Sequence, residues 1–149
     1  MEDMKIAELH ALTKSLYDRG QRLVLQSEAL TEQHQTAGTD AARANVLAAA
    51  RVLVNDSRQL HREAINLKTE VQGHENWYPT AAIYNFRLWR VMDAVSFALQ
   101  AEAAASRLNG DAAVADLLDK QSADALAEAN LYHDRARQAE QELGKVRRK

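Results

Sequence analysis

The sequence contains no cysteine, one proline and five glycines among its 149 residues. Without cysteine the chain has no disulfide, no thiolate ligand for zinc and no cysteine nucleophile. Proline and glycine are the residues that most often interrupt helices, so their scarcity favours long uninterrupted helices. Aromatic residues are also few, and roughly one residue in five is alanine, which buries little area per side chain. Close approach of helix backbones must therefore supply part of the packing.

The sequence also lacks a basic excess and a long apolar run. Its formal net charge is −2, whereas a dedicated nucleic-acid-binding protein usually carries a clear positive charge. The most apolar window, residues 81–99, is interrupted by Arg87, Arg90 and Asp93, so it is too charged to span a bilayer. The first residues are acidic and do not form a signal peptide. We expect a cytoplasmic protein without membrane association.

Turn residues divide the chain into four segments of similar length. Turn signals lie at residues 38–40, at Gly73 and at residues 109–111, and Pro79 suits the first position of a helix. We predict helices over residues 3–36, 40–72, 79–108 and 112–144. Long helices joined by short connections lie antiparallel to their neighbours. The predicted fold is all-α, an antiparallel four-helix bundle of long alanine-rich helices forming one domain over residues 1–149.

The first, second and fourth segments carry a heptad-like pattern in which large and small residues alternate along one seam. This pattern predicts coiled-coil-like packing, with the first two helices forming a tight antiparallel hairpin. In the first segment the large positions are Leu9, Leu16, Leu23 and Leu30, and the other positions are Ile6, Thr13, Gly20, Ser27 and His34. In the second segment they are Val46, Leu53, Leu60 and Leu67, alternating with Ala50, Ser57, Ala64 and Val71. The seam of the fourth segment comprises Leu118, Ser122, Ala125, Ala129, Tyr132, Ala136, Ala139, Leu143 and Val146.

The third segment differs from the others because it has two apolar faces and most of the aromatic residues. One face forms a wide stripe of Tyr84, Leu88, Val91, Met92, Val95, Ala98 and Leu99. The second face carries Ile83, Phe86, Trp89, Arg90, Asp93 and Phe97. Two apolar faces indicate either a central helix or a helix that presents one face to a partner. Because Trp and Arg are enriched at binding hot spots, we predict that these six residues bind a partner protein.

The motifs of helical enzymes are absent. Di-iron bundles need Glu-x-x-His on two helices, and the chain contains no such motif. The lone His133–Asp134 pair is weak evidence for a phosphohydrolase, and a surface histidine and aspartate explain it better. No arginine is followed by a histidine after four to six residues, as in HEPN ribonucleases, and no glycine-rich phosphate loop is present. We therefore predict no catalytic residue, no cofactor and no metal site.

The chain ends in a short basic tail over residues 145–149. Cations at a helix C-terminus complement the helix dipole, so we expect at most weak contact with nucleic acid there. The tail comprises Lys145, Val146, Arg147, Arg148 and Lys149.

Three functional hypotheses follow from the sequence. The first is a non-enzymatic protein-binding factor, an adaptor or inhibitor that uses a helix face. An accessory protein of a phage or mobile element, acting on host machinery by binding alone, would fit this class. The second is a structural homo-oligomer in which the seams continue between chains. The third is an enzyme or nucleic-acid-associated protein whose site the sequence does not reveal.

Overall fold

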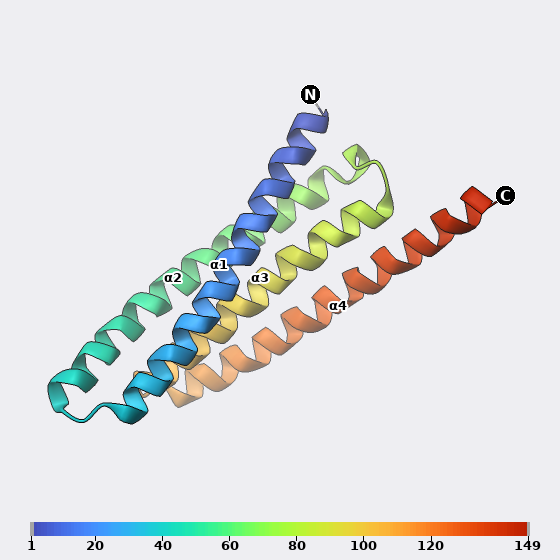
Figure 1. Cartoon of the computed structure of the whole chain (residues 1–149). Helices are drawn as coiled ribbons and strands as arrows, with labels where there is room; N and C mark the ends of the chain where they lie inside the picture. The colour runs from blue at the N-terminus through green and yellow to red at the C-terminus, as the bar shows by residue number, and fades with distance from the viewer. Residues whose placement is uncertain (1, 149) are drawn as a thin grey trace.

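The computed structural model describes the backbone of residues 2–148 and the side chains of residues 2–145. It is all-α, as predicted, with four long helices packed on one another (Figure 1). The helices are α1 (Glu2–Thr36), α2 (Asp40–Gly73), α3 (Ala81–Leu108) and α4 (Ala112–Arg148), and a short 3₁₀ helix, η1 (Glu75–Trp77), joins α2 to α3. The predicted boundaries agree to within two residues, except that α4 continues beyond residue 144 to Arg148.

Threonine caps begin two of the helices. The Thr39 hydroxyl accepts a hydrogen bond from the Ala42 amide at 3.1 Å, and the Thr80 hydroxyl accepts one from the Ile83 amide at 3.2 Å. Each hydroxyl satisfies an amide that has no partner within its helix. Because Thr80 caps α3, Pro79 precedes the helix, and its predicted place at the first helical position is wrong.

A Schellman motif ends α3. Asp111 donates its amide hydrogen to the Ser106 carbonyl at 2.9 Å, and Gly110 donates to the Arg107 carbonyl at 3.1 Å. Gly110 has a φ of +87°, which glycine adopts without steric strain. The Asp111 carbonyl then accepts from Ala115 at 2.9 Å, so this residue begins α4 as predicted.

The predicted seams form the core. All eight seam residues of α2 are buried, and so are the six of α1 between Leu9 and Ser27. The predicted burial of Leu53 and Leu60 is confirmed, with exposed fractions of 3% and 0%. In α4 the seam is buried from Leu118 to Ala136, apart from the half-buried Ser122. The side chains of the predicted basic tail after Lys145, including that of the seam residue Val146, lie outside the described residues.

Helix α3 is the central helix. Within residues 2–148 it packs extensively against α1, α2 and α4, whereas α4 packs almost entirely on α3. Two serines bring α3 and α4 together, because Ser96 Oγ donates to the Ser122 carbonyl at 3.1 Å and Ser122 Oγ donates to the Ser96 carbonyl at 2.9 Å. In Figure 1 the C-terminal part of α4 extends away from the other helices. The two apolar faces of α3 are therefore explained by its central position, because it packs against three neighbouring helices.

Across the described residues, no helix combines the length and the apolar character that a membrane span requires.

Candidate functional site: an aromatic groove between α1 and α3

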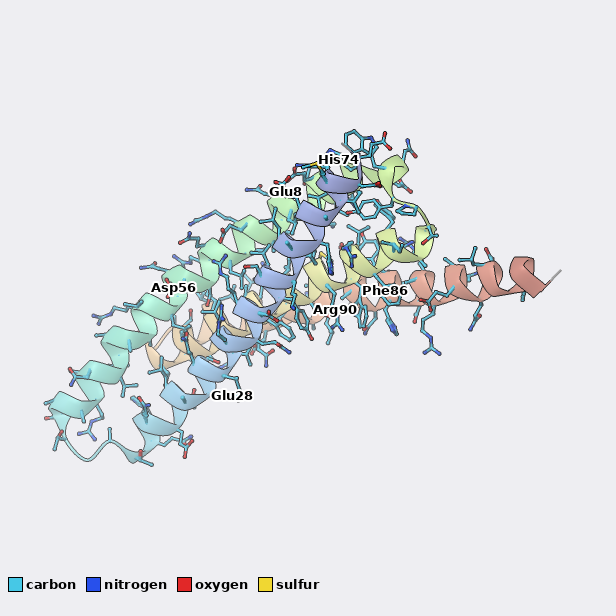
Figure 2. All side chains as sticks on the ribbon, turned by 45° about the horizontal axis from the view of Figure 1, so that its top comes forward. Glu8, Glu28, Asp56, His74, Phe86 and Arg90 are labelled. Carbon is cyan, nitrogen blue, oxygen red and sulfur yellow. The ribbon has the colours of Figure 1, made fainter. Side chains whose placement is uncertain are left out.

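An open cavity of about 400 Å³ lies between α1 and α3. It exists because α1 and α4 both pack on α3 without packing extensively on each other, so the surface of α3 between them is incompletely covered. We call this cavity the aromatic groove. Its lining residues are His10, Thr13, Lys14, Tyr17 and Asp18 from α1, and Phe86, Arg87, Trp89 and Arg90 from α3. Figure 2 labels Phe86 and Arg90 where α3 passes between α1 and α4.

Helical spacing places these residues on the groove. On α1, His10, Lys14 and Tyr17 follow one another at intervals of four and three, so they share one face. On α3, Phe86 and Arg90 are four apart, with Trp89 beside them. The two faces become one site only because α1 packs against α3.

The structure places three of the six predicted partner-binding residues, Phe86, Trp89 and Arg90, on the groove. The other three lie elsewhere on the same side of α3. Ile83 is half-buried against the hydrophobic core, and Asp93 is buried with an exposed fraction of 8%. Phe97 is half-buried and packs over Gly20 of α1. The six residues therefore form a partly covered surface rather than a fully exposed patch.

Arg90 is held in place by aromatic and ionic contacts. Its guanidinium carbon lies 4.0 Å from the centroid of the Trp89 ring and 4.5 Å from that of Tyr17. Arg90 Nη1 donates to Asp93 Oδ2 at 3.4 Å. Burial raises the pKa of the Asp93 carboxyl, and the positive charge of Arg90 partly opposes that rise. These contacts fix the orientation of Arg90 at the groove.

The aromatic surface continues from the groove to α4. The ring centroids of Phe86 and Trp89 are 5.7 Å apart, and those of Trp89 and His133 are 4.2 Å apart. Trp89 also packs against the hydrophobic core. His133, which the sequence favours as a surface residue, is half-buried and packs against Trp89 with the two ring planes tilted by 47°.

Arg87 is a groove residue that the sequence reasoning missed. It is half-buried, and its Nε atom is buried with no hydrogen-bond partner among the described residues. No carboxylate of residues 2–145 lies within salt-bridge distance of it. Burial lowers the pKa of Arg87, and nearby Tyr78 opposes this. The Tyr78 hydroxyl is likewise buried without a partner in the described part of the chain.

Lys14 adds positive potential beside Arg87 and His10. The pKa of His10 is lowered, first by burial and then by the charges of Arg87 and Lys14. Asp18 is the single carboxylate among the groove-lining residues. In the sequence, only the four-residue spacing of His10 and Lys14 could have indicated their shared face, and it did not indicate that this face meets Arg87.

Among the described residues, no group of three or more His, Asp or Glu side chains is arranged to hold a metal ion. No protein-family model, no curated protein and no solved structure matches this chain.

Proposed function

We propose that this protein is a non-enzymatic binding factor, an adaptor or inhibitor, that engages a partner protein through the aromatic groove. The observation that carries this proposal is the lining of the open cavity by Phe86, Trp89 and Arg90 together with Tyr17. Tryptophan, tyrosine and arginine are the residue types that contribute most to binding at protein interfaces. A cavity of about 400 Å³ accepts one or two partner side chains.

The anchoring of these side chains favours binding. Trp89 is fixed between the core and His133, and Arg90 is fixed between two rings and Asp93. Side chains that are already ordered lose little conformational entropy when a partner binds. The groove thus has an open aromatic surface whose side chains are ordered before a partner binds, as in binding hot spots.

The test compares a groove variant with a matched variant elsewhere. Phe86 lines the cavity, whereas Leu25 is an exposed apolar residue of α1 outside it. Tagged parent protein captures partners from a lysate of the source organism, and the affinity of the identified partner is then measured by calorimetry. We expect Phe86→Ala to weaken binding by about 2 kcal/mol, roughly 30-fold, and Leu25→Ala to leave it unchanged.

Melting temperatures of both variants complete this test. Because Trp89 is packed against the core, Trp89→Ala would mix loss of stability with loss of binding, and Phe86→Ala separates them better. A partner that binds Phe86→Ala as tightly as the parent, with both proteins fully folded, would show that binding does not use the groove.

A structural homo-oligomer is a second candidate, supported by the outer surface of α4. Leu117 and Leu131 on α4 have exposed fractions of 57% and 55%. These two leucines lie about four helical turns apart on one face of a helix that packs mainly on α3, and they offer a surface for a second chain. Sedimentation equilibrium distinguishes this function: a dimer that dissociates on Leu117→Ser and Leu131→Ser supports it, and a monomer at all concentrations refutes it.

A further inference from the structure

We propose that the aromatic groove binds an acidic side chain of the partner, whose carboxylate pairs with Arg87 and Lys14 while an adjoining apolar side chain rests on Phe86 and Trp89. This inference rests on the proposed function and specifies its partner. The ligand is therefore a protein segment in which Asp or Glu lies beside an aromatic or aliphatic residue.

Arg87 has no counterion among the described residues. The other two half-buried arginines are paired, Arg19 with Glu63 at 2.7 Å and Arg90 with Asp93 at 3.4 Å. Within residues 2–145, Arg87 is the half-buried arginine that has no carboxylate partner. A partly desolvated guanidinium gains more from a carboxylate than an exposed one does, because less water competes for it.

The residues that line the groove carry an excess of positive charge. Lys14, Arg87 and Arg90 bring three positive charges to the lining, against one negative charge from Asp18. Arg90 already pairs with Asp93, so Arg87 and Lys14 hold the charge available to a ligand. Burial is the first cause of the lowered pKa of His10, and the charges of Arg87 and Lys14 add to it. An anionic group is the complement of this site.

A ligand that fills the groove needs an apolar portion beside its anionic group. Phe86 and Trp89 form the wall of the cavity beside Arg87, and their rings present apolar surface to whatever enters. A free inorganic anion would leave that surface exposed to water, whereas an acidic residue beside an apolar one covers it. A single carboxylate also matches the fork of one guanidinium.

The test selects short random peptides on the immobilised full-length protein and measures the winners by fluorescence polarisation. We expect enriched peptides to place Asp or Glu next to an aromatic or aliphatic residue. Arg87→Gln should weaken them at least tenfold, because hydrogen bonds to charged groups contribute about 1.5–3 kcal/mol. The control is Arg51→Gln, which removes an exposed arginine of α2 that lies outside the groove.

Two further measurements do not depend on the folding of an Arg87 variant. Replacing the acidic residue of the peptide by its amide should weaken binding to the parent to a similar degree. The pKa of His10, followed by NMR, should be higher with the acidic peptide bound than with its amide variant bound, because burial is then matched and only the carboxylate offsets the charges of Arg87 and Lys14.

The outcomes separate this inference from the proposed function. Peptides that require Phe86 but bind equally to Arg87→Gln, or that lack an acidic residue, overturn the inference and leave a protein-binding groove. Failure to obtain any peptide that depends on Phe86 overturns both. Inorganic phosphate and a single-stranded oligonucleotide are tested as competitors against a second acidic peptide. If either displaces the bound acidic peptide at a lower concentration than the second peptide does, the groove prefers a phosphate-bearing ligand and the inference is overturned.

Discussion

Replacing Gly20 by alanine should destabilise the protein although it improves helix propensity. A Cβ atom at position 20 would lie 3.0 Å from both Cβ and Cδ2 of Phe97 on α3. Carbon atoms pack best at about 3.5–4.0 Å, so the contact would be at least half an ångström too short. The Phe97 ring can rotate, but its Cβ is attached to the backbone of α3 and moves only with the helix.

The expected magnitude follows from two opposing contributions. Alanine in place of glycine stabilises a helix interior by about 1 kcal/mol. Forcing one methyl group into a packed contact costs about 1–3 kcal/mol. We therefore expect Gly20→Ala to lower the free energy of unfolding by about 1 kcal/mol, measured by urea denaturation followed by circular dichroism. Gly20→Leu should be considerably more destabilising, since the additional side-chain atoms have no space.

A double-mutant cycle assigns the effect to Phe97. In a Phe97→Gly background both the ring and the Cβ of residue 97 are gone, so Gly20→Ala should become stabilising by up to about 1 kcal/mol. Gly144→Ala is the matched control, because a Cβ at that α4 position meets no atom within 4 Å. It should be neutral or slightly stabilising. Equal destabilisation by Gly20→Ala in both backgrounds would refute the reasoning, because the loss would then have nothing to do with Phe97.

Three other predictions concern burial and charge. Leu60→Ala should lower the free energy of unfolding by about 2–5 kcal/mol in the same assay, and a loss below about 0.5 kcal/mol would contradict its place in the core. Burial raises the pKa of Asp93, so the folded parent loses stability as pH rises through that pKa. The melting temperature of Asp93→Asn relative to the parent should therefore be higher at pH 7 than at pH 4, and the reverse trend would contradict a raised pKa. Burial lowers the pKa of His61, with partial opposition from Glu102, so the parent loses stability as pH falls below the unfolded pKa of about 6.5. His61→Gln should lose less stability than the parent between pH 7 and pH 5, and identical losses in the two proteins would argue against burial of a neutral His61.

The seams were predictable because they are a property of one helix at a time. In α2 a seven-residue period identifies all eight buried residues, from Val46 to Val71. The same period identifies the buried side of α1. A residue's place on its own helix depends only on sequence spacing and helix geometry, so no knowledge of the neighbouring helix is required.

The pairing of helices was less predictable. The small residue Gly20 correctly indicated a close contact, but the predicted partner was α2 of the hairpin and the observed contact is Phe97 of α3. A seam of alternating size fits several neighbours equally well, and the choice among them depends on how all the helices pack together. Likewise, Arg87 in the sequence only interrupts an apolar run, and its role beside His10 and Lys14 depends on the packing of α1 on α3.

The groove itself follows from the gradient of side-chain size along α3. The second half of this helix, from Ala94 to Ser106, is dominated by alanine and serine, which let its neighbours approach closely. The first half carries Phe86 and Trp89 on the side between α1 and α4, and rings of this size hold neighbouring helices further apart. The divergence of α4 towards its C-terminus in Figure 1 agrees with this difference. The aromatic residues of the first half of α3 therefore both widen the space beside α1 and form the wall of the groove.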